Sequence, residues 1–278
     1  MAMVQKHAVL APTPSPEETQ QPEVERATAG DAPALASVFR DAFAATDDAL
    51  VRMFPPGVGD EYQRRAWARF VRWGEPPRPA GTTAGSQDGC EADDGVVNVD
   101  GLESDEKLQL LQQHGDRSIK ADECNVFVIR DDAAGQGGVQ SAALVWVIGP
   151  GDGGVRPWRQ RWPPAAPGMA AAEWVSFQRG MAAQHDAAMG SEPHVYLEII
   201  MTHSSARRRG HASALLRAAC AAADRRRCPL YLDAQPAAMG LYARHGFAPR
   251  DDLRGAGAAD QATPTCPMVR PPPRRSFV

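Results

Sequence analysis

The amino-acid sequence predicts an α/β protein in which helices cover a mixed central sheet. Two observations support this. From residue 194 onward, apolar β-branched runs alternate with alanine-rich runs that have helical spacing. Antiparallel hairpins are predicted on both sides of this region, at residues 125–148 and at 247–270. Because strands that alternate with helices favour a helix-covered sheet, and hairpins add antiparallel strands to it, the predicted sheet is mixed.

The first elements are a short strand and two helices. Residues 24–28 alternate like a strand, and Asp31 is predicted to cap a helix whose apolar positions fall at residues 35–43. A second helix is predicted over residues 60–73, where the aromatic side chains fall near one stripe. Gly74 and the proline pair that follows it are expected to end this helix.

The later elements follow from changes of period along the chain. A glycine-rich turn joins two β-branched runs into a hairpin, and each alanine-rich segment after it has helical spacing. The predicted strands are 125–130, 139–148, 195–202, 230–234 and a terminal pair near 247–253 and 266–270, and the predicted helices are 169–188, 210–224 and 237–245.

One domain is expected over residues 23–272, preceded by a disordered tail at residues 1–22 that is rich in Pro, Glu and Gln. A disordered acidic insert is predicted at residues 75–123. Residues 81–123 carry eleven Asp or Glu against three Lys or Arg and no aromatic side chain, so they bury too little apolar area to fold. Such a segment is usually only solvated, and the alternative is that it attracts a cationic substrate.

Composition excludes several classes of function. The net charge of −4 and pI near 6.0 argue against a nucleic-acid-binding protein, which needs a cationic surface. No apolar run reaches the roughly 18–20 residues of a membrane helix, and the N-terminus lacks the apolar region of a signal peptide. Five scattered cysteines are interpreted as reduced thiols. We therefore expect a cytoplasmic protein, with the nucleus not excluded, as a monomer or a homodimer.

A loop between a predicted strand and an alanine-rich helix has the features of a phosphate site. It consists of Arg207, Arg208, Arg209, Gly210, His211 and Ala212. Backbone N–H groups in such a turn converge, and the start of the helix adds partial positive charge. Gly210 allows unusual backbone angles, Ala212 lets phosphate approach, and the arginines can add charge-assisted contacts. Alone, this hexapeptide fits an ordinary strand-to-helix turn equally well.

The surrounding sequence resembles the GNAT superfamily of acetyltransferases. Arg207, Gly210 and Ala212 match its R-x-x-G-x-A loop, and the segment from Leu241 to Phe247 matches its LYxxxGF motif. The resemblance covers residues 194–250 and is closest in character to fungal members. It implies the GNAT fold: about six to seven strands, splayed between the fourth and fifth, with about four covering helices. It also implies acetyl-coenzyme A as cosubstrate.

The resemblance also implies roles for particular residues. The pantetheine arm of the coenzyme is expected along the fourth strand, bonded to the backbone of Ile200, Met201 and Thr202. Tyr242 matches the tyrosine that approaches the coenzyme sulfur and protonates the departing thiolate, whose free pKa is about 8.5. The alternative for Tyr242 is a packing residue whose hydroxyl has a local partner.

Glu198 is the candidate general base. A protonated amine must lose a proton before it attacks a thioester, and a carboxylate in an otherwise apolar strand needs a reason to be there. Tyr196-Leu197-Glu198 is similar to the YLE of polyamine acetyltransferases, which carry the base at this glutamate. The alternative is a structural carboxylate paired with an arginine.

The histidines near the loop match no zinc-binding spacing, so no metal is expected. No cysteine is placed for a covalent relay, which favours direct attack by the amine in a ternary complex. The leading prediction is therefore an N-acetyltransferase. A small amine or polyamine is the first acceptor, and a protein amine or a secondary-metabolite amine is nearly as well supported. The alternative is a catalytically inactive coenzyme A-binding sensor or interaction module; a nucleic-acid or membrane partner is not expected.

Overall fold

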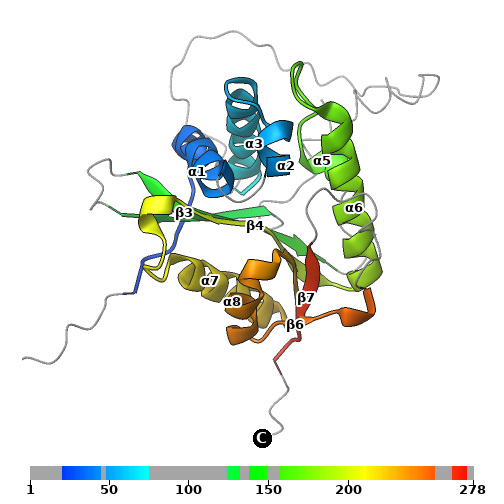
Figure 1. The fold of residues 1–278 in the computed structure, drawn as a ribbon. Coiled ribbons are helices and arrows are strands. Elements are labelled where there is room, and N and C mark those ends of the chain that lie inside the picture. Colours follow the sequence, from blue (N-terminus) through cyan, green and yellow to red (C-terminus); the bar gives the residue numbers. More distant parts are fainter. Residues whose placement is uncertain are drawn as a thin grey trace, which may run out of the picture.

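Seven strands form one mixed sheet in the computed structural model (Figure 1). The structure describes residues 21–44, 48–74, 124–131, 138–149, 157–253 and 265–273. The predicted tail lies outside these residues except for its last two, and the predicted acidic insert lies wholly outside them. In spatial order the strands are β1 (Glu25–Arg26), β2 (Cys124–Arg130), β3 (Val139–Ile148), β4 (His194–Thr202), β5 (Leu230–Ala234), β7 (Cys266–Arg270) and β6 (Ala248–Pro249).

The pairing of β4 with β5 is parallel and short. Val195, Tyr196 and Leu197 pair with residues 230–232 of β5, whereas the other neighbouring strands of the sheet pair antiparallel. From residue 198 onward β4 pairs with β3 alone among the described strands, and the end of β5 pairs with β7. This parting of the fourth and fifth strands confirms the predicted splay.

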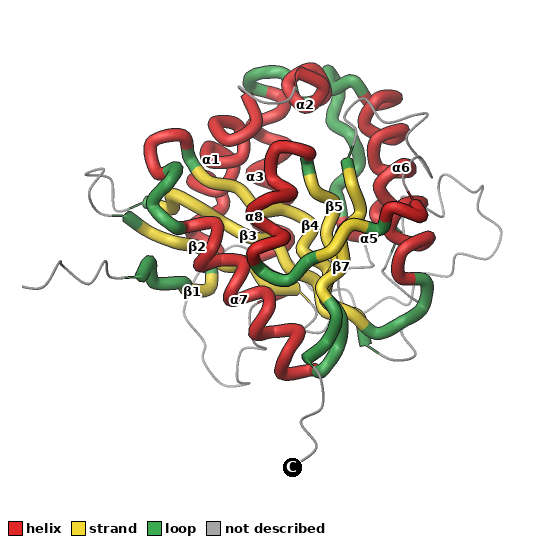
Figure 2. Tube along the Cα trace, turned by 60° about the horizontal axis from the view of Figure 1, so that its bottom comes forward, coloured by secondary structure: helices red, strands yellow, loops and turns green. Residues whose placement is uncertain are grey.

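Helices cover both faces of the sheet. Those of 13 residues or more are α1 (Ala32–Ala44), α3 (Val58–Gly74), α6 (Ala171–Met189) and α7 (His211–Arg226), and the short ones are α2 (Asp48–Met53), α5 (Trp158–Arg161) and α8 (Met239–Arg244). Figure 1 places α1, α2 and α3 on one side of the sheet and α7 and α8 on the other. Figure 2 brings α7 and α8 forward, across the strands. Within the described ranges, the four long helices match the expected number of covering helices.

The two faces bury separate apolar clusters, and β4 contributes to both. Tyr196 belongs to the cluster under α1, α3 and α6, while Val195 and Leu197 belong to the cluster under α7 and α8. This alternation is what a strand with period two must produce. Four tryptophans, Trp146, Trp158, Trp162 and Trp174, are all buried in the first cluster.

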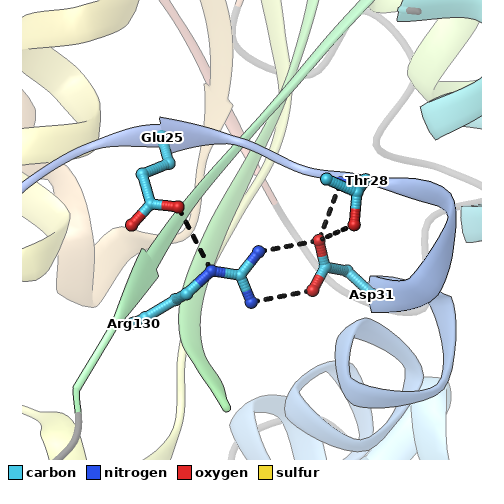
Figure 3. Close-up of polar contacts among 4 residues, drawn as sticks. All are labelled: Glu25, Thr28, Asp31 and Arg130. Atoms are coloured by element: carbon cyan, nitrogen blue, oxygen red, sulfur yellow. Dashed lines mark hydrogen bonds and ion pairs between the residues drawn. The ribbon is translucent and has the colours of Figure 1, made fainter. Parts of the chain in front are cut away.

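The prediction that Asp31 caps α1 is wrong by one turn. Asp31 ends a 3-10 helix (Ala29–Asp31) that precedes α1, and its carboxylate closes a capping box by accepting hydrogen bonds from the backbone N–H and hydroxyl of Thr28, at 2.7 and 2.9 Å. Arg130 of β2 donates two bonds of 2.8 Å to the same carboxylate and a third, of 3.2 Å, to Glu25 (Figure 3). Burial opposes ionisation, but the bonds from Arg130 and Thr28 outweigh it and lower the pKa of Asp31.

Candidate active site

A cavity of about 300 Å³ lies where β4 and β5 part. Its lining includes Tyr196, from the core cluster on one face of the sheet, and Tyr242, from the cluster on the opposite face. The cavity therefore reaches both faces through the gap between the strands. Six residues predicted for the site line it together: Glu198, Ile200, Met201, Thr202, Ala212 and Tyr242.

The side chain of Glu198 is held by two hydrogen-bond donors and one cation. The indole N–H groups of Trp146 and Trp162 donate to Oε2 and Oε1 at 2.5 and 2.9 Å, and Arg161 forms an ion pair with Oε2 at 2.5 Å. The side chains of Arg161 and Glu198 are only 4% and 7% exposed. Both carboxylate oxygens are thus occupied, which is the geometry of the arginine-paired alternative.

A second carboxyl group, Asp233 of β5, lines the cavity and was not singled out from the sequence. Its Oδ1 accepts hydrogen bonds of 2.5 Å from the Gln184 side-chain amide and from the Tyr231 hydroxyl. Its buried Oδ2 has no hydrogen-bond partner among the described residues. Burial raises the pKa of Asp233 to about 6. The signal that drew attention to Glu198, an acid in an apolar strand, was equally present here.

Tyr242 lies on the short helix α8, inside the LYxxxGF motif. Its side chain is buried, and its ring centroid is 5.9 Å from that of Phe247. Burial raises the pKa of Tyr242 to about 12, so the phenol stays protonated throughout the neutral range. The tyrosine thus presents a protonated hydroxyl group beside the cavity, on the face of the sheet covered by α7 and α8.

The predicted phosphate loop lies outside the cavity lining except for Ala212. Two of its residues have left-handed backbone, Arg208 with φ 63° and Gly210 with φ 82°, and the loop leads directly into the 16-residue helix α7. A Cβ at Gly210 would meet nothing within 4 Å, so the glycine is required by its backbone angle and not by space. Such a turn before a long helix suits an anion.

The side chains of this loop have different partners. Arg207 donates to the carbonyl of Ala42 in α1 at 3.1 Å, and Arg209 pairs with Asp131 after β2. The His211 ring is buried and lies 2.9 Å from the Ser141 hydroxyl, so it faces the sheet. Arg208 is exposed and has no side-chain partner in the described part of the chain. Of the three arginines, Arg208 is therefore the one available to an incoming phosphate.

Within the described ranges, no group of three His, Cys, Asp or Glu side chains could hold a metal ion. Nor is any helix there both long and apolar enough to cross a membrane.

A comparison with known protein families matches part of the chain. The sequence model described as the acetyltransferase (GNAT) family matches residues 168–247, which hold α6, β4, α7, β5 and α8. Among curated proteins, none matches. A GNAT acetyltransferase domain is therefore supported over residues 168–247, and the predicted fungal affinity stays a prediction.

Solved structures of acetyltransferases resemble the chain as a whole at low identity. One structure from Corynebacterium glutamicum, described as histone acetyltransferase HPA2 and related acetyltransferase, is 22% identical over 93% of this chain and all of its own, with a TM-score of 0.47. Arylalkylamine N-acetyltransferase 2 from Aedes aegypti is 13% identical over 89% of this chain and 97% of its own, with a TM-score of 0.48. The PaiA N-acetyltransferase from Thermoplasma acidophilum, solved with coenzyme A, is 10% identical over 90% of this chain and 98% of its own, with a TM-score of 0.42.

Proposed function

We propose that the protein is an N-acetyltransferase that transfers the acetyl group of acetyl-coenzyme A directly to an amine in a ternary complex. The observation that carries this proposal is the cavity at the parting of β4 and β5, which reaches both faces of the sheet. A donor approaching from the α7 and α8 face and an acceptor approaching from the α1 and α6 face can meet there. The family match over residues 168–247 supports the same chemistry.

The residues around the gap suit the donor substrate. The left-handed turn before α7 offers backbone N–H groups and the positive end of the helix dipole to the pyrophosphate, and Arg208 adds a free guanidinium. The backbone of Ile200, Met201 and Thr202 borders the gap that β5 leaves, so it can bond the amide groups of the pantetheine arm. When bound, acetyl-coenzyme A supplies an activated acetyl group.

Tyr242 is proposed to stabilise the departing thiolate. A thiol has a pKa of about 8.5, so complete proton transfer to it from a phenol with a pKa near 12 is uphill. A hydrogen bond from the hydroxyl to the developing negative charge is still favourable in a dry site. Tyr242 therefore acts as a hydrogen-bond donor to the departing sulfur, and it gives up its proton only as it receives another.

Glu198 is proposed to position other groups. As a base it would have to take a proton while both of its oxygens already accept hydrogen bonds or pair with Arg161. The contacts therefore favour the second of the two roles predicted for it, an arginine-paired carboxylate that fixes Trp146, Trp162 and Arg161 beside the cavity. A Glu198→Gln variant that kept its rate of transfer would support this role, and a variant that still bound acetyl-coenzyme A but lost transfer would favour the base.

The test of the function is to combine binding with turnover. Isothermal titration calorimetry should detect acetyl-coenzyme A binding to the full chain, and a coenzyme-release assay should detect turnover with at least one amine in a panel of monoamines, polyamines and peptide amines. Absence of coenzyme binding would contradict the proposal altogether. Binding without turnover on any amine would favour the inactive sensor or interaction module.

A further inference from the structure

We infer that the acceptor is a monoamine with an apolar, ring-sized body, and that Asp233 binds its ammonium group and removes its proton. This inference rests on the proposed function and goes further, because it names the substrate class and a catalytic residue. It narrows the sequence expectation of a small amine or a polyamine to the first of these two.

The first argument is the charge of the cavity. Among the described residues that line it, the carboxylates and bases are Arg161, His185, Glu198 and Asp233. Arg161 and Glu198 form a buried ion pair and cancel each other. Burial lowers the pKa of His185 well below its ordinary value, so this ring is neutral, and its Nε2 lies 2.7 Å from Nε2 of His194. One uncompensated anion, Asp233, is left in this lining.

One anion can match one cation. A polyamine would bring a second or third ammonium group into the cavity, where no further unpaired carboxylate lines the described walls. A buried charge without a partner is strongly disfavoured, so the site selects against such acceptors. A single ammonium next to Asp233 meets the requirement.

The second argument is the wall of the cavity toward α1, α2 and α6. It is made of large apolar side chains: Phe39, Phe43, Leu50, Phe54, Trp174 and Phe177. Several of these rings already contact one another edge to face, as Phe39 does with Phe54 and Phe54 with Trp174, at centroid distances of 5.7 and 5.1 Å. A wall of this kind gains more free energy from covering an aromatic or bulky aliphatic body than from covering a chain interrupted by charged groups.

The third argument is the geometry of Asp233. The register Leu197 with Leu232 puts Asp233 opposite Glu198, at the first position after the strands stop pairing. Gln184 holds Oδ1 and is itself fixed by the Thr265 hydroxyl at 3.0 Å, while Oδ2 keeps its lone pairs free. One oxygen therefore orients the carboxylate, and the other has an unmet hydrogen bond that an ammonium proton would satisfy.

The proton balance is complete with the groups present. The ammonium gives one proton to Asp233 Oδ2, and the freed nitrogen lone pair forms the N–C bond to the acetyl carbon. The C–S bond breaks, and its electron pair leaves with sulfur. The second nitrogen proton passes to the Tyr242 hydroxyl as this hydroxyl gives its own proton to the thiolate, so the phenol and the free thiol are both left neutral. Asp233 then releases its proton to solvent. A pKa of about 6 suits this task, because the carboxylate is ionised at neutral pH and yet more basic than an ordinary aspartate.

The experiment compares two amines and two isosteric variants of the full chain. For each protein, kcat/KM is measured with 2-phenylethylamine and with spermidine at saturating acetyl-coenzyme A. We expect 2-phenylethylamine to be preferred by about 10-fold or more, from burial of its ring. Asp233→Asn should lower kcat/KM by about 100-fold or more, as loss of a general base does, with the Kd for acetyl-coenzyme A unchanged.

Asp186→Asn is the matched control. It makes the same change of acid to amide at an exposed position of α6, two residues from Gln184, and should behave as wild type. The wild-type kcat/KM should also fall as pH drops below about 6, and the residual activity of Asp233→Asn should lack this limb. The titratable groups that interact with Asp233 are Tyr231 of β5 and Glu198 and Tyr196 of β4. His185 of α6 and Arg161 of α5 line the same cavity. Glu198→Gln should keep the limb.

The outcomes separate this inference from the proposed function. Preference for spermidine would overturn the substrate class, and near-wild-type rates in Asp233→Asn would overturn the role of the residue, while acetyl transfer itself would stand in both cases. If acetyl-coenzyme A binds but no amine reacts, the proposed function fails. In that case, quenching of tryptophan fluorescence by 2-phenylethylamine tests the pocket alone, because Trp162 and Trp174 line it. Quenching lost in Asp233→Asn supports the site, and unchanged quenching overturns it.

Discussion

Replacing Arg161 with methionine tests how the buried glutamate of the site is held. The change leaves Glu198 with two indole donors and no cation, at 7% side-chain exposure. Breaking a buried ion pair on one side costs about 3–5 kcal/mol, since the remaining charge is uncompensated. The guanidinium also lies 5.4 and 5.5 Å from the ring centroids of Trp146 and Tyr196, and these contacts are lost too. We therefore expect the free energy of unfolding to fall by about 3–5 kcal/mol.

Urea unfolding followed by tryptophan fluorescence measures this loss. Arg159→Met is the matched control, because it makes the same substitution on the same short helix. Its guanidinium is partly exposed and, among the described residues, stacks only on Trp158, at 4.5 Å. That variant should lose less than about 1 kcal/mol. Removing both partners, as Arg161→Met with Glu198→Leu, should recover a large part of the loss. A cost below about 1 kcal/mol for Arg161→Met, or a double variant that loses the sum of both single changes, would refute the reasoning.

Three further predictions concern the loop and the first helix. Gly210→Ala should lower the free energy of unfolding by about 1–2 kcal/mol, because of its φ of 82° alone, and should weaken acetyl-coenzyme A binding in calorimetry. Gly57→Ala, at a position that also has φ 82° and open space, should lower the free energy of unfolding equally and leave binding unchanged. Arg208→Ala should weaken acetyl-coenzyme A binding by about 10-fold, whereas Arg225→Ala at the far end of α7 should not. Equal affinities of the two variants would show that Arg208 does not belong to the site. Asp31→Asn should lower the free energy of unfolding at pH 7 by about 1.5–3 kcal/mol. The folded pKa of Asp31 lies below its ordinary value of 3.8, so the stability difference between wild type and variant is present above pH 3.8 and vanishes as pH falls through the folded pKa. Urea unfolding at several pH values measures this difference. A difference that does not change with pH would contradict the prediction.

Much of the fold could be predicted because its signals are local. The bounds of β5 were expected as observed, and β3 and β4 differ from expectation by one residue at most, since β-branched runs and alternation mark a strand without reference to its neighbours. The cap was misplaced at Asp31 because the partners of this carboxylate were not recognised from the sequence. Thr28 three residues earlier forms the capping box, and Arg130, which holds the same carboxylate, is 99 residues away in sequence.

The site depended on contacts that sequence spacing does not reveal. Asp233 is fixed by Gln184, 49 residues away, and faces Glu198 only because of the β4–β5 register. Trp162 and Arg161, which hold Glu198, come from a proline- and tryptophan-rich stretch without a clear period. Tyr242 could be singled out because its motif is contiguous. A role that rests on one short motif is thus visible in sequence, and one that rests on pairing between strands is not.

The most direct test of acetyl transfer at this cavity compares wild type with Tyr242→Phe, which removes one buried hydroxyl and little else. Acetyl-coenzyme A affinity is measured by calorimetry, and turnover with a reactive amine is measured by mass spectrometry of the acetylated product. The account predicts an acetylated amine from wild type, and in the variant an unchanged Kd with kcat reduced by about 100-fold. Equal kcat in the two proteins, or coenzyme binding with no acetylated product from wild type, would contradict it.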